Sequence, residues 1–357
     1  MTGAALIVGA SGVVGRAALA HFAQEGVAIG ASRRPPAGLE APHVAVDLSD
    51  AAAARALITE LPAIDRVVFA ALYEKPGLLA GWVEADQMET NRTLLAHCLD
   101  ALAGHPIRHI SLLQGTKAYG AHVQRMRVPG REREPRVPHP NFYWLQEDLL
   151  RARAEERGFA YTIWRPPVIV GHALGAPMNV LAALAAYATI AQETGEGFAF
   201  PGGACSPIDA IDTRLLAAAL AWAPGADAAR NATFNVSNGD VLYWPDLWPA
   251  LAHAFGIEAA SPEPRALAEW LPARAGVWQE VCAREGLRAP SLEDFLGDSA
   301  IYADMLFGHG RDLPPPSTLL STIALRKAGF SECVDSEDMF QDWIEQLRRA
   351  RIIPARG

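Results

Sequence analysis

Three glycines near the N-terminus have the type and the spacing needed to bind phosphate groups. An apolar, strand-like run at residues 4–9 leads directly into GASGVVG at residues 9–15, and a helical pattern follows. In such a loop one glycine permits a tight or left-handed turn, and another lets backbone N–H groups reach a pyrophosphate. The third lets the helix pack closely on the strand, and the helix N-terminus adds positive potential. Gly9, Gly12 and Gly15 therefore predict a dinucleotide-binding site.

Two arginines stand where such a site selects its dinucleotide. The end of the second predicted strand carries Arg33 and Arg34 and no carboxylate, although an acid there would bind the 2′-hydroxyl of the adenosine ribose. Guanidinium groups suit a 2′-phosphate because they form charge-assisted, bidentate hydrogen bonds. The pair predicts NADPH/NADP⁺ rather than NADH. Asp47 and Leu48, at the end of the third predicted strand, are placed to touch the adenine, or Asp47 caps the next helix.

The tyrosines and lysines suggest a proton donor. Hydride-transfer enzymes with a dinucleotide-binding sheet usually place a lysine four residues after a tyrosine, so that the ammonium lowers the pKa of the phenol. None of the seven tyrosines here has that partner, and Tyr143 has Glu147 instead. There are only three lysines, Lys75, Lys117 and Lys327. Lys117 follows the fifth predicted strand, at the edge where open α/β sheets bind ligands, so we expect it to approach Tyr143 from another element.

Alternating strands and helices would position these residues. Strands are predicted at residues 5–8, 27–31, 43–46, 66–70, 108–113 and 161–170, with helices at 13–24, 51–61, 82–102 and 142–156. Such alternation forms right-handed βαβ units and a parallel sheet covered on both faces. We expect a Rossmann-type, doubly wound α/β fold in which residues 1–170 form the NADP-binding domain.

The pattern changes after residue 171. Helices are predicted at residues 180–192, 213–222, 248–255, 266–284 and 339–351, and two further strands at 208–211 and 233–236. We expect residues 171–357 to form a smaller, mostly helical substrate-binding region, with some segments returning to the Rossmann sheet.

Composition excludes several other classes of protein. The 357 residues carry a net charge of −9 and no long basic run, so binding of nucleic acid through bulk charge is not expected. The longest apolar stretches, 180–191 and 215–222, are shorter than the roughly 20 residues that span a membrane, so no membrane contact is expected. Four scattered cysteines lack CxxC spacing and predict neither a metal site nor disulfides. With no signal-peptide pattern at the N-terminus, a cytoplasmic location is expected.

Several motifs resemble one enzyme family. The sequence PNFYWLQED at residues 140–148 resembles the NFYYxxED motif of the progesterone 5β-reductase and iridoid synthase family, atypical members of the extended short-chain dehydrogenases/reductases. The stretch 114–120 is similar to the family's TGxKHYxGP motif. Further similarities occur at residues 32–35, 165–171, 200–203, 234–244, 247–248, 343–344 and 352–354. They follow in order over nearly the whole chain.

The resemblance implies an activity and a set of site residues. The family's catalytic pair corresponds to Tyr143 and Lys117, and its members use NADPH to reduce the C=C bond of activated enones. The tyrosine, poised by the lysine, hydrogen-bonds the carbonyl oxygen as it becomes an enolate. The substrate would be a small apolar enone or carbonyl compound, and a homodimer is possible. The implied cofactor contacts are Gly9, Ser11, Gly12, Val13, Gly15, Arg33, Arg34, Asp47, Leu48, Ala70, Leu113, Gln114, Tyr143, Ile169 and Met178.

The chain departs from the family pattern on the substrate side. Trp144 replaces the second tyrosine of NFYY, Ala118 replaces the histidine of KHY, and Ala121 and His122 stand in place of Gly-Pro. The pocket is therefore less well determined than the catalytic pair. Met178, Trp222 and Trp278 could line an apolar pocket, but such residues on helices more often belong to the core.

Other functions stay open at this point. The same Tyr143 and Lys117 could serve 1,2-reduction of a ketone or aldehyde, because protonating an alkoxide needs the same donor. A non-catalytic NADP(H)-binding sensor is a second alternative, although a sensor needs neither the phenol nor the ammonium. Sugar-nucleotide epimerisation is less expected because the Tyr-x-x-x-Lys pair is missing.

Overall fold

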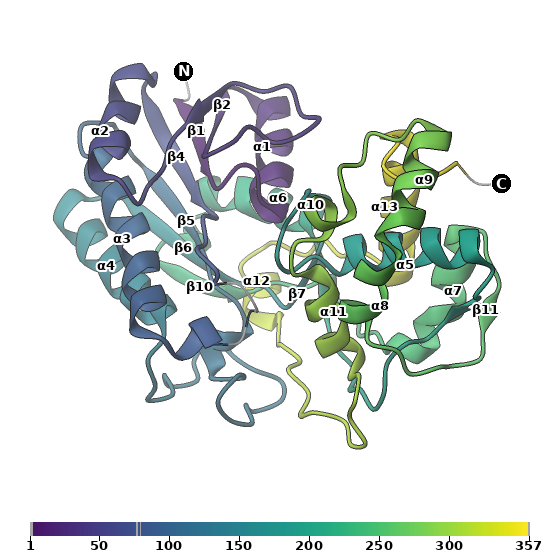
Figure 1. Ribbon diagram of the computed structural model, residues 1–357. Helices are drawn as coiled ribbons and strands as arrows, with labels where there is room; N and C mark the ends of the chain where they lie inside the picture. The colour runs from purple at the N-terminus through teal and green to yellow at the C-terminus, as the bar shows by residue number, and fades with distance from the viewer. Residues whose placement is uncertain (1–2, 76–77, 79, 356–357) are drawn as a thin grey trace.

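Short apolar strands alternate with helices through the first half of the chain and build one parallel sheet (Figure 1). The structure is a computed structural model that describes residues 3–75, 78 and 80–355. Its main sheet contains seven strands in the order β10-β6-β5-β4-β1-β2-β3, and all neighbours are parallel. The strands are β1 (Ala4–Val8), β2 (Ala28–Ser32), β3 (His43–Ala45), β4 (Ile64–Phe69), β5 (His109–Leu113), β6 (Ala160–Arg165) and β10 (Ala232–Asn235).

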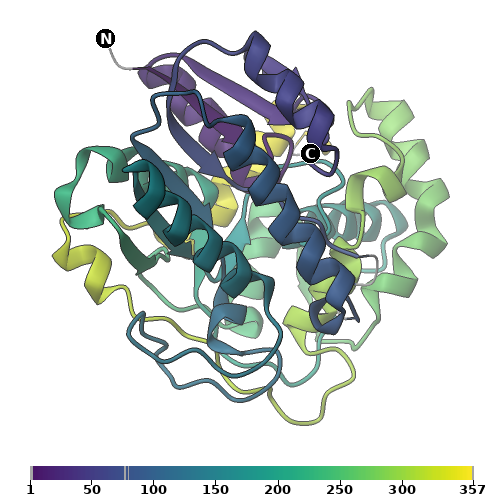
Figure 2. The ribbon, with the colours of Figure 1, turned by 90° about the vertical axis from the view of Figure 1, so that its left-hand side faces the viewer.

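Helices cover both faces of this sheet because its strands are apolar on both sides. On β1, Ala5 and Ile7 pack in one hydrophobic cluster, and Leu6 and Val8 pack in another. The first face carries α1 (Val13–Glu25) and α6 (Thr213–Trp222), and the second carries α2 (Ala51–Glu60), α3 (Ala85–Ala101) and α4 (Phe142–Arg157). In Figure 2 the second face, with α2, α3 and α4, is turned towards the viewer. The predicted Rossmann-type fold is confirmed.

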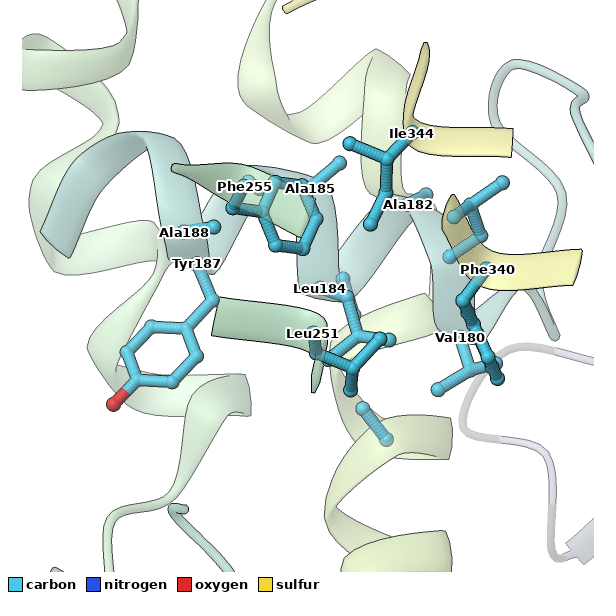
Figure 3. Close-up of a cluster of buried hydrophobic side chains, with 14 of the residues drawn as sticks. Val180, Ala182, Leu184, Ala185, Tyr187, Ala188, Leu251, Phe255, Phe340 and Ile344 are labelled. Atoms are coloured by element: carbon cyan, nitrogen blue, oxygen red, sulfur yellow. The ribbon is translucent and has the colours of Figure 1, made fainter. Parts of the chain in front are cut away.

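The C-terminal half forms a helical region beside the sheet, built around α5 (Val180–Thr194). Every residue from Val180 to Ala191 is buried, as expected for a helix that is apolar all round. Figure 3 shows Leu251 and Phe255 of α7 (Trp244–Phe255), and Phe340 and Ile344 of α13 (Ser336–Arg349), packed around it. The region also contains α8 (Leu267–Trp270), α9 (Ala275–Glu285), α10 (Leu292–Leu296) and α11 (Ser299–Phe307).

Prolines account for two differences from the predicted elements. The strand expected at residues 161–170 breaks at Pro166 and Pro167, because proline has no N–H to donate to a neighbouring strand. Its second part, β7 (Val168–Val170), pairs with β9 (Ala210–Asp212) outside the main sheet. The helix expected at 266–284 is interrupted at Pro272, where a 3₁₀ turn, η5 (Pro272–Arg274), separates α8 from α9.

Two segments of the C-terminal half return to the sheet. The strand β10 lies at its edge beside β6, and α6 packs against α1.

The helix expected at 82–102 is instead η1 (Ala80–Val83) followed by α3. The remaining elements, most of them short, are α12 (Ile323–Lys327), β8 (Phe198–Ala199), β11 (Ala259–Ala260), η2 (Thr116–Tyr119), η3 (Ala223–Gly225) and η4 (Asp227–Ala229). Among the described residues, no helix is both long and apolar enough to cross a lipid bilayer.

Candidate active site

The glycine loop joins β1 to α1 and has the conformation that its spacing predicted. Gly9 has a φ of +86°, and a Cβ atom on it would lie 2.7 Å from the carbonyl of Ala70, just past β4. A Cβ on Gly15 would lie 2.1 Å from the oxygen of Gly9, so helix and strand pack as closely as expected. Gly12 is the N-cap of α1 and has no side chain to bond the first-turn amides. These amides suit an anion such as a pyrophosphate.

The loop lies where the strand order reverses. β1 stands between β4 and β2, and ligands of open α/β sheets bind at such a switch point, beyond the carboxyl ends of the strands. Two of the expected cofactor residues lie at such strand ends, Ala70 after β4 and Leu113 at the end of β5. Ile169 lies within β7 and Met178 precedes α5, and all four residues are partly buried. Ser11 is exposed and Val13 is partly buried at the start of α1.

The adenosine side carries one more cation than the sequence indicated. Arg33 and Arg34 follow directly after β2 and are exposed. Arg16, in the first turns of α1, donates from its Nε to the carbonyl of Ala37 in the same loop at 3.4 Å. Burial lowers the pKa of this arginine. The signal that could have identified it is its position immediately after Gly15.

Asp47 and Leu48 differ in exposure. The carboxylate of Asp47 is exposed and accepts hydrogen bonds from the amide and hydroxyl of Ser49 at 2.9 and 2.7 Å. These bonds, with the charge of Arg33, lower its pKa. Asp47 does not cap α2, because that function belongs to Asp50, which accepts from the amide of Ala52 at 2.7 Å. Leu48 is buried in the core.

Glu147 stands where the Tyr-x-x-x-Lys pattern has its lysine, and its side chain bonds to other residues of the protein. Glu147 accepts from Gln114 Nε2 at 3.1 Å and pairs with Arg165 at 3.5 Å and Arg151 at 3.0 Å. Burial opposes its ionisation, but these partners hold the pKa of Glu147 below its ordinary value. Gln114 also donates to the carbonyl of Tyr143 at 3.2 Å and accepts from Arg165 at 3.0 Å. The side chain of Gln114 is therefore occupied by contacts within the protein.

Asn141 connects the two expected catalytic residues. It is the N-cap of α4, and its Oδ1 accepts from the amide of Tyr143 at 3.0 Å. Its Nδ2 donates to the carbonyl of Lys117 at 2.9 Å and contacts Nε2 of His139 at 3.2 Å. The buried amide thus joins η2, which carries the lysine, to the helix that carries the tyrosine.

The indole of Trp82 packs against both Lys117 and Tyr143. Lys117 Nζ lies 3.4 Å from the centroid of the indole ring, a cation–π contact, and the ring of Tyr143 packs against the same indole at 5.4 Å. The Tyr143 hydroxyl lies 3.3 Å from the position that a Cβ on Gly115 would take. Lys117 of η2 and Tyr143 of α4 thus contact one indole from two separate elements.

A carboxylate that the sequence analysis missed completes the cluster. Glu74 follows β4 and accepts from Trp82 Nε1 at 3.0 Å and from Gln87 Nε2 at 3.1 Å. Burial raises its pKa, although the charge of Lys117 opposes this. The argument from the carboxyl edge of the sheet that selected Lys117 applies equally to Glu74. Tyr302 of α11, whose charge would raise the pKa of Tyr143, lies on a helix that was not predicted.

Burial shifts the pKa values of the two expected catalytic residues in opposite directions. It raises the pKa of Tyr143, with further contributions from Glu74 and Tyr302, so that the phenol stays protonated. It lowers the pKa of Lys117 to about 8, while Glu74 opposes the shift. The cluster around Trp82 therefore contains a neutral hydroxyl and an amine that is charged below about pH 8.

The other candidates from the sequence lie elsewhere. Trp278 stacks on Phe295 in the helical core at 5.0 Å, and Trp222 packs against Phe234 and Phe330 behind the sheet, so neither lines a pocket beside Tyr143. Within the described ranges, no three His, Cys, Asp or Glu side chains gather as a metal site would require.

Comparison with known proteins agrees with the family resemblance of the sequence motifs. Residues 5–203 match the family described as the NAD dependent epimerase/dehydratase family. An (S)-8-oxocitronellyl enol synthase of Camptotheca acuminata is 30% identical over 331 residues, 85% of this chain and 83% of that one. A 3-oxo-Δ4,5-steroid 5β-reductase of Arabidopsis thaliana is 27% identical over 374 residues, 98% of this chain and 93% of that one.

Solved structures share the fold at lower identity. A UDP-glucose 4-epimerase of Thermotoga maritima, with UDP-glucose, superimposes with a TM-score of 0.67 and 16% identity over 97% of this chain and 99% of that one. A UDP-glucose 4-epimerase of Thermus thermophilus, in complex with NAD, gives 0.65 and 16% over 97% and 99%. At this identity the likeness concerns the fold alone.

Proposed function

The chain belongs to the NAD-dependent epimerase/dehydratase family and, within it, to the progesterone 5β-reductase and iridoid synthase family of atypical short-chain dehydrogenases/reductases, and we propose that it is an NADPH-dependent reductase of activated C=C bonds. The observation that carries the proposal is the pair Tyr143 and Lys117. The two residues come from α4 and η2 and meet on the indole of Trp82. They supply a hydroxyl donor and an ammonium although the usual helical spacing is absent.

The cofactor proposal rests on the cradle at the start of α1. Gly9, Gly12 and Gly15 leave the first-turn amides open for a pyrophosphate, and Arg33 and Arg34, with Arg16 nearby, suit the 2′-phosphate. The remaining contacts would be Ser11, Val13, Asp47, Leu48, Ala70, Leu113, Gln114, Tyr143, Ile169 and Met178. We assign cofactor binding to residues 1–170 and substrate binding mainly to residues 171–357.

In the proposed mechanism the protein stabilises charge on the substrate. NADPH, when bound, supplies the hydride that the β-carbon of the enone accepts. Tyr143 donates a hydrogen bond from its hydroxyl to the carbonyl oxygen, where negative charge grows as the enolate forms. Lys117, as an ammonium, favours that charge electrostatically. The donor role requires a protonated phenol, in agreement with the raised pKa of Tyr143.

The setting of the enzyme belongs to the same proposal. Because the chain departs from the family pattern at Trp144, Ala118 and His122, we define the substrate by its class alone, a small apolar enone. All four cysteines are free, which supports a reducing, cytoplasmic location. A homodimer is also proposed, and its mass in solution can be measured by light scattering.

A steady-state assay tests the function. NADPH oxidation is followed with small enones and with the matching saturated ketones, and we expect turnover of the enones. Tyr143→Phe should lose turnover by about 100-fold or more, as for a removed proton donor, and should keep NADPH affinity measured by fluorescence. Turnover of ketones alone would replace the proposal by 1,2-reduction. Unchanged activity in Tyr143→Phe would refute the mechanism.

A further inference from the structure

Residues 74 and 75, after β4, bond to polar side chains at the start of α3. Lys75 forms ion pairs with Glu84 and with Asp86, and its amide donates to Gln87 Oε1 at 3.0 Å. Gln87 is completely buried and in turn donates to Glu74. The carboxylate of Glu74 is therefore fixed in place by contacts on two sides.

Glu74 is connected to Lys117 through one aromatic ring. The carboxylate accepts from the indole N–H of Trp82, and the face of that indole lies 3.4 Å from Lys117 Nζ. Accepting a hydrogen bond from the indole N–H increases the electron density of the ring, which strengthens its attraction for a cation. Trp82 is buried, so this attraction acts with little screening by water.

Among the described charged groups, Glu74 is the one that favours the charged form of Lys117. Among the described residues, Glu74 affects the pKa of Lys117, and Lys117 affects the pKa of His122. Tyr143 packs against the same indole. Burial, together with His139 and Lys117, lowers the pKa of His122 to about 4, so it is neutral near pH 7. Asp298 bears on Glu74, and Tyr302 on Tyr143. Of these, Glu74 is the group that opposes the loss of the proton from Lys117.

We propose that Glu74, acting with Trp82, is a positioning residue that holds Lys117 as an ammonium beside Tyr143. It extends the proposed function, because it takes Lys117 as the catalytic cation. Neither residue touches the reacting atoms in this proposal. The carboxylate keeps the amine charged, and the indole fixes where that charge lies.

The scarcity of lysine makes the proposal directly measurable. In protein labelled with ¹³C-lysine, three side-chain Cε signals report Lys75, Lys117 and Lys327, and Lys75→Arg and Lys327→Arg identify them. We expect Lys117 to titrate near pH 8 in the native chain and about one pH unit lower in Glu74→Gln, as for the loss of a nearby opposite charge. Glu74→Asp should restore most of the difference.

The matched control is Glu84→Gln, which removes the same charge from the N-cap of α3. It should change the titration of Lys75 and leave that of Lys117 unchanged, because Glu84 pairs with Lys75. In active enzyme, the decline of kcat above about pH 8 should move to lower pH in Glu74→Gln, with the KM for NADPH unchanged. The lysine titration needs no substrate, so it stays informative even if the chain reduces another compound.

A second measurement needs no variant. In the native chain the Cε signal of Lys117 should show an additional inflection where Glu74 itself titrates, above its ordinary range. This inflection covers the case in which Glu74→Gln does not fold. An unchanged Lys117 titration in folded Glu74→Gln, or the absence of the inflection in the native chain, would overturn the proposal.

Discussion

The phenol of Tyr143 faces a position where the chain has no side chain. Gly115 has extended backbone angles that any residue adopts, so its backbone does not require glycine. A Cβ atom there would lie 3.3 Å from the Tyr143 hydroxyl and 3.6 Å from the carbonyl of Pro166. In the proposed mechanism, the substrate oxygen enters this space beside the hydroxyl to accept its hydrogen bond.

Gly115→Ala should therefore affect catalysis more than stability. The added methyl group fits with a shift of a few tenths of an ångström but displaces the substrate oxygen from the hydroxyl, and small misplacements of this kind cost about 100-fold in rate. We expect kcat/KM to fall by that order with little change in Tm. Gly104→Ala is the matched control, since nothing lies within 4 Å of its added Cβ. Full activity in Gly115→Ala would contradict the assignment of this space to the substrate.

At the scale of elements, the start of α4 and the turn η2 replace the fixed helical spacing of a Tyr-x-x-x-Lys pair. Two groups on one helix keep their separation because the helix is rigid, whereas groups on separate elements need a connection. The side chain of Asn141 provides it by capping α4 and bonding the carbonyl of Lys117. The side chain of Glu147, at the usual lysine position, instead joins β5, α4 and β6 through Gln114 and Arg165.

Two substitutions separate the functions of Asn141. Asn141→Asp keeps an oxygen that accepts from the Tyr143 amide but turns a second oxygen towards the Lys117 carbonyl, in place of the N–H donor. We expect its kcat to fall at least tenfold because η2 is displaced, and its stability to fall by about 1–3 kcal/mol because a buried carboxylate oxygen faces a carbonyl. Asn141→Ala loses the cap as well, which costs about 1 kcal/mol of stability. Urea unfolding and steady-state kinetics measure the two effects. Asn141→Asp with native kcat would show that Asn141 only caps the helix.

Local patterns predicted the sheet and the phosphate loop well, because apolar runs and glycine spacing act over a few residues. Apart from the strand expected at 161–170, the strands of the main sheet, α1 and α6 lie close to their predicted positions, and Gly9 and Gly15 have the predicted packing. Contacts between distant segments could not be predicted in this way. Glu74 and Trp82 meet Lys117 across about 40 residues of sequence, and Tyr302 approaches Tyr143 from α11. The local sequence around these residues does not indicate which distant segment of the chain they contact.

At the scale of the whole molecule, a C-terminal segment joins the helical region to the sheet. Leu320 forms a β-bridge with Gly130, and its amide donates to Asp209 Oδ2 at 2.9 Å. Asn235 of β10 donates to the carbonyls of Gly130 and Ser321 at 3.0 and 3.1 Å. Segments around residues 130, 235 and 320 therefore meet, and Leu320 connects them to Asp209, which is only 3% exposed.

Asp209 should make the stability of this junction depend on pH. Its Oδ1 has no hydrogen-bond partner in the described part of the chain, and burial raises its pKa to about 6 despite the bond from Leu320. An acid that is harder to ionise when folded stabilises the protein most below its unfolded pKa of about 3.9. This stability is lost as the pH rises from about 4 to 6, and the buried charge remains a cost of up to about 3 kcal/mol above that range.

Asp209→Asn should remove that cost, because its amide oxygen can still accept from Leu320 and no charge is buried. We expect the variant to be more stable than the native chain by about 1–3 kcal/mol at pH 7.5, and the difference to disappear near pH 4. Urea unfolding at the two pH values measures both quantities. The control is Asp312→Asn, which replaces an exposed carboxylate eight residues before Leu320. It should leave the stability unchanged at both pH values. Lower stability of Asp209→Asn at pH 7.5 would mean that the ionised carboxylate is itself stabilised, by a partner of its free oxygen such as a buried water.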